Sequence, residues 1–228
     1  MVKVTFIGHS CFALDDGKHK LLIDPFITGN PVAKATDEMK KADYILITHG
    51  HGDHLGDSIQ LAKDNDAAII ANYELCTYCN SQGIEKIHPM HIGGGNKFPF
   101  GSVKLTIAHH GSTLGDKLEY GGNPVGFIIR IDNKVIYHAG DTGLFLDMKL
   151  IGELDNIDLA MVPIGGNFTM DIPDGIKAVE FLKAKKAIPM HYNTFDLIAC
   201  DPQQFVDGIK PFGSDGIALG FGDTYELN

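Results

Sequence analysis

The sequence predicts a mixed α/β (α+β) fold of four layers, in which two β-sheets face each other and helices cover both outer faces. Three observations support this prediction. Short apolar strands open the chain, a second strand-rich stretch occupies its middle, and each stretch is followed by alternating helices and strands. Because a sheet buries its apolar face against another layer, the repeated order fits an αββα sandwich.

The first half begins with closely spaced strands separated by a turn at Asp15-Asp16-Gly17. The run Tyr44-Ile45-Leu46-Ile47-Thr48 is apolar on both faces, as in a strand buried on both sides. Helical and strand patterns then alternate. We expect strands at 2–7, 21–23, 44–48 and 67–71, and helices at 57–65 and 73–81.

In the second half, turn signals at Gly93-Gly94-Gly95 and Asp132-Asn133 separate apolar strands. We expect strands at 85–91, 103–109, 124–132, 134–139, 158–164 and 187–190, helices at 144–152, at 173–184 and after Asp201-Pro202, and a last hairpin near 216–226. No linker or low-complexity tract divides the chain, so residues 1–228 are expected to form one domain.

The composition excludes some classes of function. The formal charge is −10, with 19 Lys and Arg, which argues against a nucleic-acid groove. No apolar stretch approaches the roughly 20 residues of a membrane span, and no signal peptide is apparent. Four cysteines do not indicate a disulfide-rich secreted domain. We therefore expect a cytoplasmic protein that acts on a small molecule, and self-association into a homo-oligomer stays open.

The strongest signal is a cluster of metal-binding residue types directly after the strand at 44–48. His49, His51, Asp53 and His54 fall within six residues and are interleaved with glycines. Glycine lets the backbone curl tightly, so that two pairs of side chains can point to neighbouring positions. Imidazole and carboxylate together suit Zn²⁺, and also Mn²⁺ or Fe²⁺. The cluster predicts a metal site.

One cluster cannot fill two coordination spheres, so further ligands are expected at later strand ends. Three segments qualify because each follows an apolar strand and precedes a loop, which is where active sites of layered folds gather. They are Ala108-His109-His110-Gly111-Ser112, Gly140-Asp141-Thr142-Gly143 and Pro189-Met190-His191-Tyr192.

With these motifs, in the order His-x-His-x-Asp-His, His, Asp, His, the chain resembles the metallo-β-lactamase superfamily over nearly its whole length. The short forms Gly8-His9-Ser10-Cys11, Leu22-Ile23-Asp24-Pro25, Ala139-Gly140-Asp141-Thr142 and Met190-His191-Tyr192 are most similar to a compact branch of metal-dependent hydrolases. That branch is similar to L-ascorbate-6-phosphate lactonase-like proteins.

The resemblance implies an αββα sandwich with a two-metal site at one edge of the sheets. One metal would be held by His49, His51 and a third histidine. The other would be held by Asp53, His54 and His191, with Asp141 between the two ions.

The third histidine is either His109 or His110. Along the strand at 103–109, the odd positions are apolar, so His109 would continue the buried face and His110 the polar face. The superfamily pattern places the ligand just before Gly-Ser, which is His110. We therefore expect His110 to bind metal and His109 to pack beside it.

Other residues have weaker signals. Asp24 ends a strand, and the resemblance makes it an acceptor that orients a ligand histidine. His9 can reach the substrate side as an acid for the leaving group, and Asn167 and Thr169 can line the pocket. The pair Cys76 and Cys79 lacks a second pair, so both are expected in the core.

Two divalent ions, most simply Zn²⁺, bridged by Asp141 and a water would lower the pKa of that water towards about 7. Asp53 can orient the resulting hydroxide. We therefore expect hydrolysis of an ester-type bond in a lactone, phosphodiester or thioester. The alternatives are a di-iron oxidoreductase, which usually carries Glu in the cluster and a flavin domain, and a nuclease or RNA-processing enzyme, which usually carries a basic surface.

Overall fold

The computed structural model describes residues 1–115 and 118–228 and contains two seven-stranded sheets. The first sheet has the order β16-β1-β2-β3-β4-β5-β6. Its strands are β1 (Val2–Gly8), β2 (Cys11–Asp15), β3 (Lys20–Ile23), β4 (Tyr44–Leu46), β5 (Ala68–Asn72), β6 (Ile87–Met90) and β16 (Thr224–Leu227).

The second sheet has the order β15-β14-β13-β12-β11-β8-β7. Its strands are β7 (Gly95–Phe98), β8 (Gly101–Ile107), β11 (Val125–Ile131), β12 (Lys134–His138), β13 (Leu159–Pro163), β14 (Lys186–Met190) and β15 (Asp215–Gly216). A separate short pair is formed by β9 (Thr113–Leu114) and β10 (Glu119–Tyr120).

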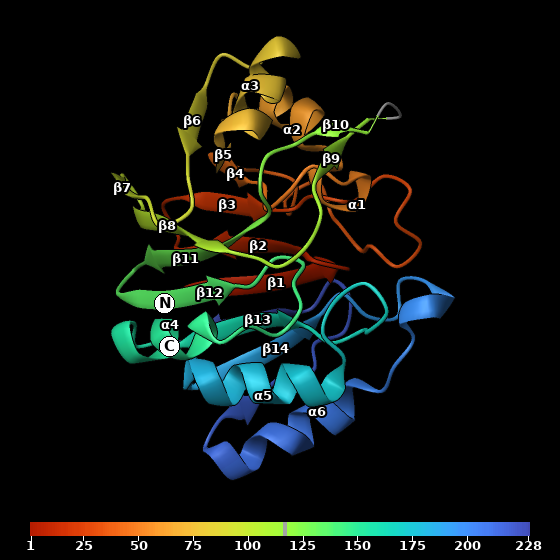
Figure 1. The fold of residues 1–228 in the computed structure, drawn as a ribbon. Helices are drawn as coiled ribbons and strands as arrows, with labels where there is room; N and C mark the ends of the chain where they lie inside the picture. Colours follow the sequence, from red (N-terminus) through yellow and green to blue (C-terminus); the bar gives the residue numbers. More distant parts are fainter. Residues whose placement is uncertain (116–117) are drawn as a thin grey trace.

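The helices lie outside the sheets. They are α1 (Gly52–Leu55), α2 (Ser58–Asn65), α3 (Tyr73–Ser81), α4 (Asp147–Leu154), α5 (Ile172–Leu182) and α6 (Pro202–Ile209), with 3₁₀ turns η1 (Asp196–Ile198) and η2 (Lys210–Phe212). Figure 1 shows α2 and α3 on one side of the stacked sheets and α4, α5 and α6 on the other. The predicted four-layer αββα arrangement is confirmed.

Side-chain caps explain where several helices begin. The Asn72 side chain accepts a hydrogen bond from the backbone N–H of Leu75 at the start of α3. Asp171 caps α5 in the same way, and Asp201 caps α6, each followed by a proline in the first turn. Such caps satisfy N–H groups that have no partner within the helix.

The main core lies between the two sheets. It includes Phe6 and Phe12 of the first sheet, whose rings stack at 4.8 Å, and Phe127 of the second sheet. A second cluster fills the space between the first sheet and helices α2 and α3. The β4 strand contributes to both, because Leu46 belongs to the first cluster and Ile45 to the second. Its prediction as a strand buried on both faces is confirmed.

One sequence-based expectation about the elements is wrong. No hairpin forms near 216–226, because β15 pairs with β14 in the second sheet while β16 pairs with β1 in the first. A turn is present at the triple glycine, where the Gly94 N–H donates to the His91 carbonyl before β7 begins at Gly95 and pairs with β8. Residues 52–55 of the histidine cluster form the short helix α1.

The topology brings several strand ends to one edge of the molecule. In the first sheet β1, β3 and β4 run in the same direction, and in the second sheet β8, β12 and β14 do so. Ligands in layered folds bind beyond the carboxyl ends of strands. Every metal ligand predicted from the sequence follows the carboxyl end of one of these strands.

Among the helices that the structure describes, none combines the length and apolar character needed to cross a membrane.

Candidate metal centre

The histidine cluster is shaped by tight packing around α1. The backbone N–H of His54 donates to the carbonyl of His51, which closes the turn that separates the first pair of side chains from the second. Gly50 is needed there, because a Cβ atom would lie 2.8 Å from both the Leu114 side chain and the Thr113 carbonyl oxygen. Gly50 therefore allows close packing against residues 113–114 as well as a tight backbone turn.

His49, His51 and His110 form the first candidate metal group, with ligand atoms all within 4.8 Å of one another. His49 Nε2 and His51 Nδ1 are 3.0 Å apart. The ring of His110 lies 5.1 Å from each of the other two rings. Burial holds the pKa of His49 well below its ordinary value, with the nearby His54 lowering it further. A neutral imidazole is the form that binds a metal.

The structure corrects the interpretation of His109. We expected this side chain to continue the buried face of its strand, but it is exposed. The reason is that β8 ends at Ile107, and the His109 N–H donates to the Thr142 hydroxyl instead of to a neighbouring strand. The alternation therefore stops before His109, whose ring lies 4.9 Å from that of Phe145.

The second candidate metal group contains His9, Asp53, His54 and His191. Asp53 and His54 come from α1, whereas His191 follows β14 and His9 follows β1. Burial raises the pKa of Asp53, but the hydrogen bond from His9 and the charge of His54 outweigh it and keep the pKa below its ordinary value. The carboxylate is therefore ionised and ready to bind a cation.

Asp141 lies between the two groups. Its Oδ2 is 3.2 Å from His54 Nε2, 3.0 Å from His191 Nε2 and 3.6 Å from His110 Nε2. Burial raises the pKa of this carboxyl, but the charges of His54 and His191 outweigh it, so the pKa lies well below the ordinary value. A buried carboxylate surrounded by histidines from both groups has the placement expected of a bridging ligand.

Asp24 lies within hydrogen-bond distance of His54, where it can play the orienting role that the sequence predicts. This buried carboxylate accepts hydrogen bonds from the backbone N–H and the hydroxyl of Thr48, at 2.8 and 2.6 Å, and from His54 Nδ1 at 2.7 Å. With its proton at Nδ1, neutral His54 presents a lone pair at Nε2. That lone pair faces Asp141.

Unsatisfied buried atoms show that these residues fit a metal. His54 Nε2, Asp141 Oδ1 and His191 Nδ1 are buried and have no hydrogen-bond partner in the part of the chain that the structure describes. Burial lowers the pKa of His54, but the charges of Asp141 and Asp24 outweigh it and raise the pKa well above 6.5. The pocket thus needs positive charge beside Asp141, which either a proton or a divalent cation supplies.

His9 does not fit the role expected from the sequence. Its side chain is fully buried, and its two ring nitrogens lie 2.9 Å from the Thr194 hydroxyl and 3.2 Å from Asp53 Oδ2. Burial lowers the pKa of His9 to about 4, partly opposed by the bond to Asp53. An imidazole with both nitrogens engaged inside the protein does not reach a leaving group.

The loop after β13 carries the residues expected to line the pocket. Asn167 is exposed and Thr169 is half-buried. The Met170 N–H donates to the Thr142 carbonyl, one residue after Asp141, so this loop runs beside the Asp141 carboxylate. Contact with a substrate stays a proposal for both residues.

Sequence reasoning missed three hydroxyl residues that support the site. Thr48 bonds to Asp24 and lies 2.9 Å from His49 Nδ1, Ser112 accepts from the Gly50 N–H, and Thr194 bonds to His9. Only Thr48 had a signal, because it directly precedes the cluster. Cys76 and Cys79 lie on α3 and are buried in the core between this helix and the first sheet, as predicted.

Comparisons with known proteins agree with this geometry. Residues 3–191 match the profile of the Beta-lactamase superfamily domain. A UPF0173 metal-dependent hydrolase from Carboxydothermus hydrogenoformans is 51% identical over 93% of this chain and 94% of its own length. YtkL from Bacillus subtilis, also a UPF0173 metal-dependent hydrolase, is 49% identical over 99% of this chain and 100% of its own.

A solved structure has a closely similar fold. Igni18, a novel metallo hydrolase from the archaeon Ignicoccus hospitalis, has a TM-score of 0.90 and 37% identity, covering 100% of this chain and 99% of its own. Two facing mixed sheets with a histidine and aspartate cluster at their shared edge define a metal-dependent hydrolase. The chain belongs to the beta-lactamase superfamily, with the metallo-β-lactamase fold.

Proposed function

We propose that the chain hydrolyses an ester-type bond of a small molecule (a lactone, phosphodiester or thioester) with two divalent metal ions. The observation that carries this proposal is the position of Asp141, whose Oδ2 lies within 3.6 Å of Nε2 atoms from both metal groups. One ion would be held by His49, His51 and His110. The other would be held by Asp53, His54 and His191, with Asp141 bridging the pair.

When bound, two such ions polarise the scissile bond and lower the pKa of water between them towards about 7. The chain supplies the rest. The Asp53 side chain is 31% exposed and can accept a hydrogen bond from the attacking water. Asn167 and Thr169 lie on the loop beside Asp141, where they can contact a substrate. Nitrogen and carboxylate ligands favour Zn²⁺, with Mn²⁺ or Fe²⁺ as alternatives.

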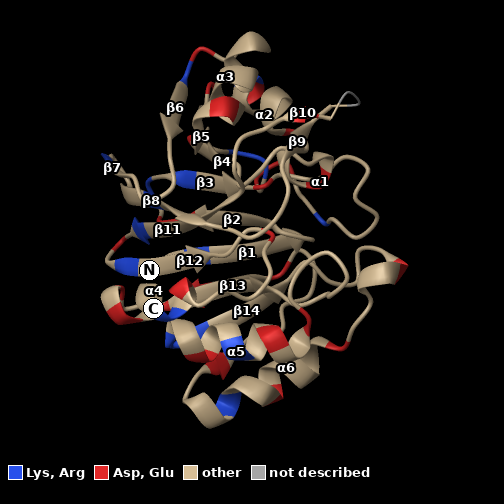
Figure 2. Ribbon diagram, in the orientation of Figure 1, with Lys and Arg blue, Asp and Glu red and all other residues tan. Residues whose placement is uncertain are grey.

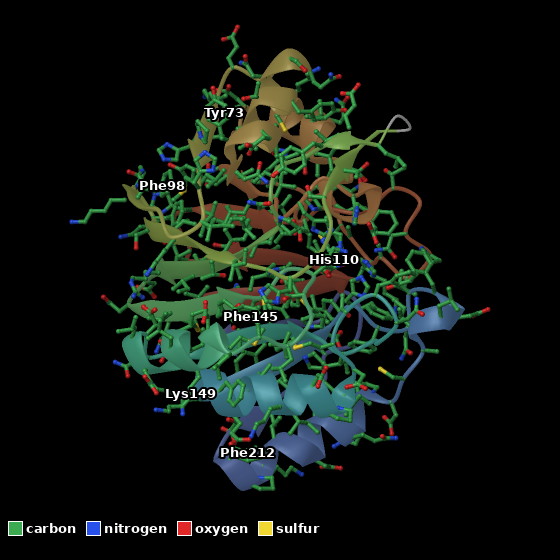
Figure 3. All side chains as sticks on the ribbon, in the orientation of Figure 1. Tyr73, Phe98, His110, Phe145, Lys149 and Phe212 are labelled. Atoms are coloured by element: carbon green, nitrogen blue, oxygen red, sulfur yellow. The ribbon has the colours of Figure 1, made fainter. Side chains whose placement is uncertain are left out.

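Two features of the surface concern where a substrate binds and of what kind it is. A cavity of about 680 Å³, lined by Phe98 and Arg130 among others, lies at the far end of the sheets from His110 (Figure 3) and contains none of the predicted ligands. In the view of Figure 2, Lys and Arg are spread over β3, β7, β8 and α5 and do not gather around α1. A small molecule therefore suits the site better than a polyanion.

Metal content and turnover test the proposal together. The protein is purified without added metal, analysed for bound elements, and screened with chromogenic phosphodiesters, lactones and thioesters. We expect about two divalent ions per chain and turnover of at least one substrate class.

Asp141→Asn should abolish turnover, because an amide cannot bridge two cations as a carboxylate does. His91→Ala is the matched control, since His91 is exposed and stacks on Tyr73 away from the cluster. Saturation at one ion, or turnover that survives Asp141→Asn, contradicts the two-metal function.

A further inference from the structure

We propose that His9 is a positioning residue, which together with Thr194 orients Asp53 and through its main chain holds His191. The inference rests on the proposed function, because it assigns His9 a task toward the second metal group. It also replaces the expectation that His9 acts directly on the leaving group.

The backbone of His9 is held in an uncommon conformation. His9 follows β1 with φ 60°, and His191 follows β14 with φ 55°. Few residues other than glycine adopt this left-handed region, and they persist there only where the surroundings fix them. The His191 N–H donates to the His9 carbonyl at 2.7 Å, and the two rings lie 4.1 Å apart. The end of β1 is thereby tied to the end of β14.

The Thr194 hydroxyl and the Asp53 carboxylate together favour one tautomer of the His9 ring. A neutral imidazole has one donor nitrogen and one acceptor nitrogen. The Thr194 oxygen is 2.9 Å from His9 Nδ1 but 3.5 Å from its other acceptor, the Tyr192 carbonyl. Because the ionised Asp53 carboxylate beside Nε2 can only accept, the ring proton lies on Nε2, and Nδ1 then accepts from the nearer Thr194 hydroxyl.

The proton on Nε2 then has one partner, which is Asp53 Oδ2 at 3.2 Å. The opposite tautomer would place a lone pair against the carboxylate and repel it. Donation from His9 to one oxygen leaves the other oxygen of Asp53 to bind a cation. A histidine or carboxylate ligand is usually oriented by such a partner.

Two aromatic rings hold His9 in place. Phe26 and Phe195 lie edge-on to its ring, with centroids 5.8 and 5.7 Å away. The His9 side chain is fully buried between them. Because the ring can neither swing out nor exchange its partners for water, its hydrogen bond to Asp53 is geometrically fixed.

The test removes the Thr194 hydroxyl without changing the shape of the side chain. Thr194→Val removes one of the two hydrogen bonds that fix the His9 ring, so the ring is free to tilt and its hydrogen bond to Asp53 weakens. We expect one of two Zn²⁺ ions to bind about 10- to 100-fold more weakly, measured by titration against a chromogenic chelator. Thr194→Ser keeps the hydroxyl and should hold both ions. Thr77→Val removes an exposed hydroxyl on α3 and is the matched control.

A second variant and a spectrum address the case in which Thr194→Val does not fold. His9→Asn tolerates a positive φ but is too short to reach Asp53, and it should weaken the same ion. Ring-nitrogen NMR of the wild-type protein should show His9 protonated at Nε2. A wild-type His9 protonated at Nδ1 overturns the inference without any variant.

The outcomes separate this inference from the proposed function. Wild-type protein that saturates with one ion contradicts the two-metal function and, with it, the role given to His9. Wild-type protein with two ions, combined with equally tight binding in Thr194→Val and His9→Asn, overturns only the inference. Weaker binding of one ion in both variants, with Thr194→Ser unchanged, supports it.

Discussion

Replacing Asp24 with Asn should weaken metal binding while the protein still folds. The change keeps size and shape, and Asn tolerates the positive φ of 45° at this position. One amide oxygen can still accept from the Thr48 N–H. The amide nitrogen, however, would face two donors, the Thr48 hydroxyl and His54 Nδ1.

The conflict is relieved if His54 moves its proton to Nε2, which removes the lone pair that faces Asp141. Loss of such an orienting partner typically weakens metal binding by about 10- to 100-fold. At about 1.4 kcal/mol for each tenfold change, this corresponds to roughly 1.4–2.8 kcal/mol of metal-binding free energy. We expect a loss in this range for one ion of the pair.

The assay is a titration with Zn²⁺ against a competing chelator, accompanied by thermal unfolding of the metal-free protein. Asp57→Asn is the control, because Asp57 accepts from the backbone N–H groups of Ile27 and Thr28 and an amide oxygen can still do so. If Asp24→Asn binds both ions within about twofold of the wild type, Asp24 does not set the tautomer of His54.

Further expectations concern the third histidine, the backbone and pH. His110→Ala should lose one ion, whereas His109→Ala should keep both and change stability by no more than about 0.5 kcal/mol, as measured by metal content and unfolding; the reverse result would invert the assignment. Gly56→Ala places a Cβ 2.4 Å from a backbone carbonyl oxygen and should cost about 1–3 kcal/mol of unfolding free energy, more than Gly29→Ala, which meets nothing within 4 Å. In the metal-free protein, the raised pKa of His54 contributes stability that is complete below about pH 6.5 and lost as pH rises through the folded pKa. The thermal midpoint of chelator-treated protein should therefore fall as the pH rises above about 6.5, and a steady rise would contradict the assigned charge.

Much of the fold was predictable because its signals are local. The helix expected at 73–81 is α3 (Tyr73–Ser81), with the Asn72 cap directly before it. The strand expected at 134–139 is β12 (Lys134–His138), opposite β11 across the Asp132-Asn133 turn. Strong periodicity and turn residues fix such elements without reference to the rest of the chain.

The errors arose where residues far apart in the sequence determine which strands pair and where a strand ends. The short strands β15 and β16 look like a hairpin, yet Gly216 pairs with Ala187, and Val2 pairs with Leu227 from the other end of the chain. His109 continues an alternating pattern, but a hydrogen bond to Thr142 ends the strand before it. These contacts leave no local trace in the sequence.

The candidate site likewise contains residues that the sequence predicted and residues that it did not. The ligand types were readable from the cluster and the strand ends, and the structure brings these side chains together at one edge. The support from Thr194 to His9 was not readable, because the two residues are 185 positions apart and each has an ordinary context. The role of such a hydroxyl can be assigned only when the structure shows which group it bonds to.

The pairing of β1 with β16 has a consequence for the order in which the molecule assembles during translation. The strand at residues 2–8 is made long before residues 224–227, which cover one of its edges. An uncovered strand edge can pair with another chain, and contacts this distant along the sequence form slowly. The nascent protein therefore carries a vulnerable edge for most of its synthesis.

The two halves of the site mature at different times for the same reason. The residues of the first group have all been synthesised once His110 is made, whereas the second group must wait for His191. Under the proposed two-metal function, the growing chain would therefore contain all three histidines for one ion well before it contains every residue that holds the other.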